Sequence, residues 1–211
     1  MDGNRIDLGG QWRRMIDGRL IDFVPVPGSY APVGQCVLER EFDCPWAAGG
    51  AERVFLVTEG VLASAAFELN GRPIGSAGPW ATYRFELPAG LLQAHNTIRA
   101  TVRDIVDDFG PTPGRRFDGG LVRDLYIERR PAAYLAGMAF RAELAADFSS
   151  AECTVDVQID AAGGAELQHV RLVLHERDTH RLVATLFAFP GQAARFKVEW
   201  PRLWSPEMPN L

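Results

Sequence analysis

The sequence predicts an all-β protein made of two β-sandwiches in tandem. Alternation of apolar and polar residues dominates the chain; for example, Ile98, Ala100 and Val102 alternate with polar residues and share one face. The same alternation returns in residues 155–160 and 195–200. Glycine, proline and asparagine turn signals separate these segments, and the evidence for helices is thin. Half-buried antiparallel strands are what this pattern favours.

The strongest hairpin signal is Asn70-Gly71, which follows the apolar-polar-apolar segment 67–69. Both residues tolerate the positive φ that a type I′ turn requires. We therefore expect two antiparallel strands to meet at this pair.

Residues 132–146 are rich in alanine but also fit strand alternation, with Gly137 as an interruption. We predict a strand here and place a domain boundary just before it, at Pro131. After this point the strands come at the short, regular spacing that is typical of an immunoglobulin-like sandwich. The predicted domains are residues 1–131 and 132–211.

Composition restricts the classes of partner. The chain has 211 residues, a formal net charge of -5 and 47% hydrophobic residues. A net negative charge does not favour binding to a phosphate backbone, so we expect no nucleic-acid partner. The longest apolar runs fall far short of the ~20 residues of a membrane helix, and the first ten residues lack a signal pattern. We expect a cytoplasmic protein with no membrane partner.

The cysteines and histidines predict no metal site and no cofactor. Cys36 and Cys44 flank a single predicted strand and would lie roughly 26 Å apart, which is beyond the reach of a disulfide. Together with Cys153 they are expected to be reduced and structural. His175 and His180 flank a charged segment that resembles a hairpin turn, so we expect them at the surface and not as ligands.

The run FDGGLVRDLYIERR, residues 117–130, combines two glycines with an Arg-Asp pair. Gly119-Gly120 permits positive φ or a close backbone approach where a loop enters a strand. In an ideal continuous strand, Arg123 points to the face of the following apolar residues and Asp124 to the opposite face. A buried arginine needs a carboxylate or carbonyl partner, so we interpret Arg123 as a structural residue that ties the loop down.

This run resembles the Gly-Gly-(apolar)-(any)-Arg-Asp-Val signature of glycoside hydrolase family 2. Other segments resemble motifs of the same family in the same order: LxGxW at residues 8–12, VPGSW/Y at 26–30, YxRxF at 38–42, V-x-L-N-G-x-x-V-G at 67–75 and LWSPExPxLY at 203–211. The resemblance covers essentially the whole chain. It implies a galactose-binding-like jelly-roll sandwich over residues 1–131, followed by an immunoglobulin-like β-sandwich that is incomplete at its C-terminus.

The family that this chain resembles carries its two catalytic glutamates on a third domain, a TIM barrel, with the acid/base in an Asn-Glu dipeptide. This sequence contains no Asn-Glu dipeptide, and a barrel takes ~250 residues by itself. We therefore expect the chain to be the non-catalytic N-terminal region of a β-glycosidase, with the missing barrel as its partner. The sequence does not identify the sugar.

Sugar sites combine an aromatic face with carboxylates that accept hydroxyl hydrogen bonds. Trp80, Asp107, Asp108 and Asp118 supply such groups in predicted loops. The resemblance implies an aspartate where this chain has Gly114, so the three aspartates are candidates to replace it. Alternatives stay open for two of these residues, because Asp118 could equally cap the turn and a core role is favoured for Trp80.

A core or interdomain role is likewise favoured for Trp12, Trp200 and Trp204, because prolines that follow the last two mark a stiff turn. Two other functions remain open for the chain. The first is a free-standing carbohydrate-binding module. The second is a structural or adhesive pair of sandwiches that forms a homo-oligomer through exposed strand edges.

Overall fold

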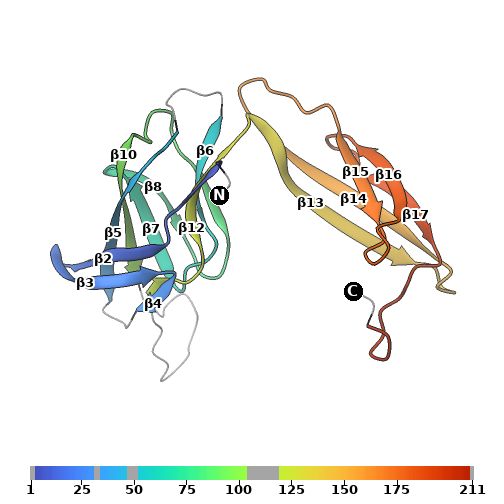
Figure 1. Cartoon of the computed structure of the whole chain (residues 1–211), viewed down its shortest axis with the longest axis horizontal. Helices are drawn as coiled ribbons and strands as arrows, with labels where there is room; N and C mark the ends of the chain where they lie inside the picture. Colours follow the sequence, from blue (N-terminus) through green and yellow to red (C-terminus); the bar gives the residue numbers. More distant parts are fainter. Residues whose placement is uncertain (1–2, 31–33, 47–51, 104–118, 210–211) are drawn as a thin grey trace. The chain divides into compact units, whose positions relative to one another are not determined.

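The computed structural model describes residues 3–30, 34–46, 52–103 and 119–209 (Figure 1). The chain divides into two compact units, Met1–Pro131 and Ala132–Leu211. Strands and their connections make up the described residues, so the all-β prediction is confirmed. No helix among these residues is long and apolar enough to cross a membrane.

The first unit is a sandwich of two antiparallel sheets. The larger has the order β3-β2-β5-β10-β7-β8, the smaller has the order β1-β12-β6-β9, and β4 pairs separately with β11. The strands are β1 Arg5–Asp7, β2 Gly10–Ile16, β3 Arg19–Val26, β4 Gly28–Tyr30, β5 Gln35–Asp43, β6 Arg53–Thr58, β7 Ser64–Leu69, β8 Arg72–Ala77, β9 Tyr83–Glu86, β10 His95–Arg103, β11 Gly119–Leu121 and β12 Leu125–Arg130.

The core of this unit lies between the two sheets. Trp12, Phe67 and Ile98 enter it from the larger sheet, and Leu56 and Ile127 from the smaller one. Ile98, with Ala100 and Val102, forms the buried face of β10, as the alternation predicts. Burial of these large side chains supplies the main driving force for folding of the unit.

The predicted hairpin at Asn70-Gly71 is confirmed. Asn70 and Gly71 have φ values of 52° and 77° and join β7 to β8. The Asn70 amide also donates to the carbonyl oxygen of Leu91 and to Asn96 Oδ1, while Asn70 Oδ1 accepts from the Thr97 backbone. The side chain thus connects this turn to the loop that precedes β10.

The sequence motifs at residues 8–12 and 38–42 come together at Leu8. The buried Trp12 donates its indole N–H to the carbonyl oxygen of Leu8 at 2.8 Å, and Arg40 donates to the same oxygen at 2.9 Å. Arg40 also contacts the carbonyl oxygen of Gly9. One side chain from each motif, Trp12 of LxGxW and Arg40 of YxRxF, therefore satisfies the backbone oxygen of Leu8.

The second unit has a three-stranded sheet, β13-β14-β17, and the hairpin β15-β16. A register shift between Leu135 and Gly137 interrupts β13 where the sequence predicts an interruption. The core is small and centres on Val155, Ala188 and Ala194. The strands are β13 Ala133–Leu144, β14 Ser150–Ala161, β15 Val170–His175, β16 Leu182–Ala188 and β17 Ala194–Glu199. All three cysteines are free, and Cys36 lies in β5 with Cys44 just after it, as expected.

Candidate functional site

The two glycines of the Gly-Gly motif pair with a motif some ninety positions earlier in the chain. In the β4-β11 sheet, Gly119 lies opposite Tyr30, and Gly120 lies opposite Ser29. A Cβ on Gly120 would lie 2.3 Å from the carbonyl oxygen of Gly28. Close backbone approach, and not positive φ, is therefore the reason for glycine at position 120.

Tyr30 secures the same turn from the other side. Its hydroxyl donates to the carbonyl oxygen of Pro25 at 2.7 Å. Burial, reinforced by the neighbouring Cys36, raises the pKa of the Tyr30 hydroxyl well above its usual value, although Arg14 opposes the shift. The hydroxyl therefore remains a neutral donor at physiological pH and has a structural role.

Trp80 lies beside this small sheet. Its backbone N–H donates to Val61, and Val61 forms bridges with both Pro79 and Leu121. Leu62 in turn donates to the carbonyl oxygen of Gly120. Backbone hydrogen bonds therefore connect the loop that carries Trp80 to the Gly-Gly motif.

The core role favoured for Trp80 is wrong. Its side chain is 62% exposed, and its φ is 61°, a conformation that bulky residues rarely adopt. The bridge at Pro79 turns the chain here before β9 begins, so the ring points away from the sandwich core. The other predicted sugar contacts, Asp107, Asp108 and Asp118, lie outside the described residues.

The prediction of a buried Arg123 is also wrong. The run from Gly119 is not one strand, because β11 ends at Leu121 and β12 begins at Leu125. Between them Arg123 is exposed, and its aliphatic stem lies over Gly60, where an added Cβ would be 3.2 Å from Arg123 Cδ. The break lets the chain pass from the β4-β11 sheet to the four-stranded sheet, which removes Arg123 from the register of the core residues.

Asp124 ties this crossing to the start of the chain. Its carboxylate accepts a hydrogen bond of 2.8 Å from Arg5, whose guanidinium also lies 3.7 Å from the centre of the Tyr126 ring. Burial by itself would lower the pKa of Arg5, but the hydrogen bond to Asp124 and nearby negative charge raise it overall. Sequence analysis missed Arg5, because nothing in its local sequence marks it.

Glu128 is the most buried carboxylate of the four-stranded sheet. Arg84 and Arg130 each donate to it at 2.9 Å. Burial alone would raise the pKa of Glu128, but the hydrogen bonds and charges of the two arginines lower it overall. A carboxylate held ionised in this way stabilises the sheet and cannot act as a general acid at neutral pH.

The structure brings two further carboxylates together on the larger sheet. Glu39 and Glu41 both bind Nη2 of Arg13, at 2.9 and 2.6 Å, and Arg99 binds the second oxygen of Glu39 at 2.6 Å. Glycoside hydrolysis needs one carboxyl group that carries a proton. Because guanidinium groups occupy both oxygens of Glu39, this pair lacks the arrangement of a catalytic pair.

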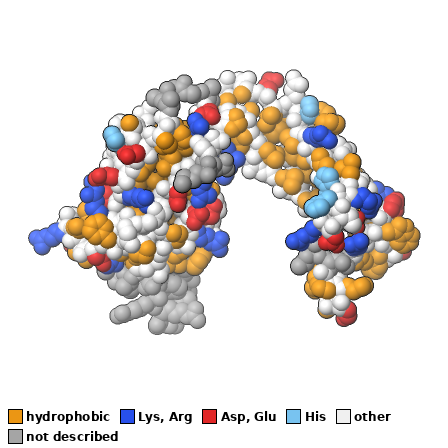
Figure 2. Space-filling model, viewed as in Figure 1, with side chains coloured by type: hydrophobic (Ala, Val, Ile, Leu, Met, Phe, Trp, Pro, Cys, Tyr) orange, Lys and Arg blue, Asp and Glu red, His pale blue; other side chains and the backbone are white. Residues whose placement is uncertain are grey.

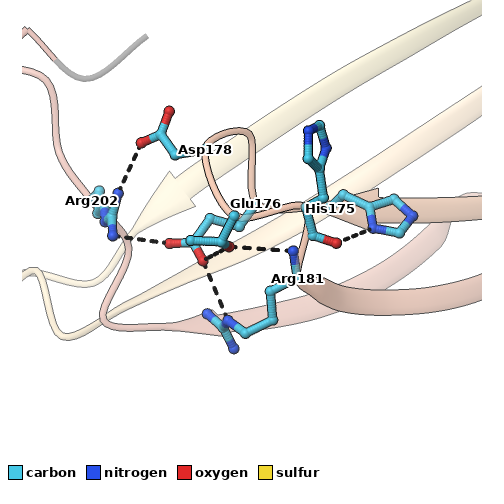
Figure 3. A network of polar contacts seen from close by, with 7 residues as sticks. His175, Glu176, Asp178, Arg181 and Arg202 are labelled. Carbon is cyan, nitrogen blue, oxygen red and sulfur yellow. Dashed lines mark hydrogen bonds and ion pairs between the residues drawn. The ribbon is translucent and has the colours of Figure 1, made fainter.

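The second unit contains an open hollow of about 1010 Å³ at the turn between β15 and β16. Figure 3 shows its polar wall, in which Glu176 accepts hydrogen bonds or ion pairs from Thr179, Arg181 and Arg202. Arg202 also binds Asp178, which lies in the same turn. The network fastens the segment after β17 to the hairpin turn, and its main charges are already paired.

The histidines of this hairpin have structural contacts. His175 donates through Nδ1 to the carbonyl oxygen of His180 (Figure 3), and both are exposed as predicted. In the part of the chain that the structure describes, no group of three or more His, Cys, Asp or Glu side chains is placed to hold a metal ion.

The tryptophans divide between core and surface. The core role predicted for Trp12 is confirmed. For Trp200 and Trp204 a core role is wrong, because they are 79% and 59% exposed. Trp200 ends β17 with a φ of 49° and a backbone hydrogen bond to Ser149, so the chain turns outward before the indole can reach the core.

No protein-family model matches this chain, and no curated protein matches it. Solved structures do match. A β-glucuronidase from an uncultured Clostridium superposes with a TM-score of 0.76 at 17% identity, over 99% of this chain and 42% of that chain. The Bifidobacterium dentium β-glucuronidase, in complex with coumarin-3-O-glucuronide, gives 0.73 at 22% identity, over 99% of this chain and 44% of that chain.

A Bacteroides fragilis structure assigned as a β-galactosidase gives a TM-score of 0.71 at 20% identity, over 95% of this chain and 36% of that chain. The chain shares its fold with part of these glycosidases. It spans less than half of the length of each of them. The resemblance that the motifs predict is therefore confirmed at the level of the fold.

Proposed function

We propose that this chain is the non-catalytic N-terminal region of a β-glycosidase of family 2. The observation that carries the proposal is the fold likeness, which extends over nearly all of this chain but less than half of each glycosidase. The first unit serves as the galactose-binding-like jelly roll and the second as the immunoglobulin-like sandwich. Both act in the cytoplasm as a scaffold for a catalytic TIM barrel.

The carboxylates of the described residues support a non-catalytic role. A retaining glycosidase needs an ionised nucleophile and a protonated acid about 5 to 5.5 Å apart. Among the described residues, Glu39 and Glu41 are joined by Arg13, and Glu176 and Asp178 are joined by Arg202. The arginine side chains therefore occupy carboxylate oxygens that a catalytic pair would turn toward the sugar.

The test is an assay of the purified chain with 4-nitrophenyl β-D-glucuronide and 4-nitrophenyl β-D-galactoside. We expect no release of 4-nitrophenol above the buffer rate. Glu39→Gln and Glu41→Gln serve as controls, since a contaminating enzyme would be unaffected by either. Turnover that copurifies with the chain and is lost in these variants would contradict the proposal.

The exposed Trp80 favours a second function, a free-standing carbohydrate-binding module. An exposed indole in a constrained loop is suited to stack on a sugar ring. If this function holds, calorimetry with a panel of mono- and oligosaccharides will detect binding that is lost in Trp80→Ala. Binding that is unchanged in Trp80→Ala would exclude Trp80 as the contact.

A further inference from the structure

The outer face of the larger sheet carries a row of side chains that crosses four neighbouring strands. The strand register places them directly opposite one another: Phe23 of β3, Arg13 of β2, Glu39 of β5 and Arg99 of β10. They point away from the core, because the alternate positions Trp12 and Leu38 are buried inside it. Glu39, clamped by both arginines, fixes the geometry of the row.

A hollow of about 470 Å³ lies at the Phe23 end of this row. It is lined by Gln11, Arg13, Phe23, Glu39, Arg40 and Glu41. It is shallow and open to solvent. Its walls come from regular strands of a sheet with a packed core, so their positions are rigid.

Phe23 gives the hollow an aromatic wall. The Phe23 side chain is 61% exposed. It belongs to an apolar patch on the β2-β3 hairpin that also includes Leu20 and Ile21. Figure 2 shows hydrophobic side chains, in orange, gathered at this hairpin. A planar apolar ring of this kind stacks on the C–H face of a sugar.

The charges that line the hollow indicate an uncharged ligand. Two arginines and two glutamates cancel, and both arginines already have partners: Arg13 binds the glutamates, and Arg40 donates to the carbonyl oxygens of Leu8 and Gly9. An anion would find no unpaired cation here. A hydroxyl group, in contrast, donates to Glu41 and accepts from the Gln11 amide.

We propose that this hollow binds a neutral saccharide, with the Phe23 ring against one face of the sugar and Glu41 and Gln11 on its hydroxyls. Trp80 is not among the residues that line this hollow, and β3 and β8 are the opposite edges of the six-stranded sheet. The site is therefore separate from the one discussed above. It also does not depend on the proposed function, since it requires only the sheet itself.

The experiment is a titration of the ¹⁵N-labelled 211-residue chain with methyl β-D-glucopyranoside, methyl β-D-galactopyranoside and cellobiose, followed by NMR. At least one of these sugars should shift the amide signals of Arg13, Phe23 and Glu41.

Phe23→Ala should weaken the affinity about tenfold through loss of the ring contact. Phe23→Leu should weaken it similarly, because it keeps an apolar side chain without a flat face. Glu41→Gln should weaken it about threefold or more.

Two variants serve as matched controls. Phe140→Ala removes an exposed aromatic ring from the second unit, and Glu68→Gln removes a carboxylate from the same outer face on β7. Both should leave the affinity unchanged, and D-glucuronate should bind more weakly than the neutral sugars.

The proposal is overturned if none of the neutral sugars shifts the amide signals of Arg13, Phe23 and Glu41, or if the shifts survive in Phe23→Ala. It is also overturned if light scattering shows a dimer that Phe23→Ala dissociates, since the patch is then a contact between copies.

Discussion

Gly120 faces the backbone of Gly28 so closely that a Cβ at position 120 would lie 2.3 Å from the Gly28 carbonyl oxygen. Gly120→Ala should therefore force β4 and β11 apart and lower the free energy of unfolding by about 2–4 kcal/mol. Chemical denaturation monitored by tryptophan fluorescence measures this loss. Gly3→Ala is the matched control, because nothing lies within 4 Å of a Cβ there. Equal stability of the two variants would show that the close approach is not structural.

Asn70 combines a backbone role with a side-chain role, and two substitutions separate them. Asn70→Gly keeps the positive φ but loses the hydrogen bonds to Leu91, Asn96 and Thr97. Asn70→Ala loses both. We expect a loss of about 1–3 kcal/mol for glycine and a further ~1 kcal/mol for alanine. If alanine proves as stable as glycine, the turn does not depend on its left-handed conformation.

Glu128 makes the stability of the first unit sensitive to acid. Its folded-state pKa lies below the ordinary value of 4.5, so its ionised form is favoured by folding. The stability that it contributes is fully present above about pH 4.5 and is lost as the pH falls through the lowered pKa. Glu128→Gln should cost about 1–3 kcal/mol at pH 7, and the difference from the unmodified chain should shrink below pH 4.

Denaturation curves at several pH values measure this effect. Glu143→Gln, at an exposed position of β13, is the control and should change the free energy of unfolding by less than about 0.5 kcal/mol. A Glu128→Gln cost that stays constant down to pH 2 would mean that the arginine contacts do not favour the ionised carboxylate.

Trp12 and Trp200 are predicted to differ sharply in their contribution to stability. Trp12 is fully buried and donates to the Leu8 carbonyl oxygen, so Trp12→Phe should cost about 2–4 kcal/mol through a cavity and the loss of this hydrogen bond. Trp200 is mostly exposed, and Trp200→Phe should change the stability by less than about 0.5 kcal/mol. Thermal unfolding of the two variants provides the comparison. Similar melting temperatures would contradict the assignment of Trp12 to the core.

Sequence patterns predicted the strands well where one physical cause decided the structure. The alternation of β10 and the Asn70-Gly71 turn follow from burial on one face and from tolerance of positive φ. The Gly-Gly motif was recognised, but its partner Ser29 was not, because long-range pairing leaves no local signal. The motif order also predicted the fold likeness to glycosidases, which 17–22% identity leaves difficult to detect by sequence alone.

Side-chain positions were harder to predict, for two reasons. Arg123 was placed on the core face by assuming an unbroken strand, and the break after Leu121 invalidates that register. Trp80 was assigned to the edge of the core, and Trp200 to the core or a domain interface, but both side chains are exposed at positive φ values that turn the chain outward. The hollow beside Phe23 arises from residues of three strands, so no single segment of the sequence indicates it.

The nucleotide sequence that follows codon 211 tests the central claim most directly. The claim is that these two units support glycoside chemistry that another domain performs. The account predicts that the reading frame continues into an α/β barrel of ~250 residues that contains an Asn-Glu dipeptide. A stop codon with no barrel encoded in frame would contradict it.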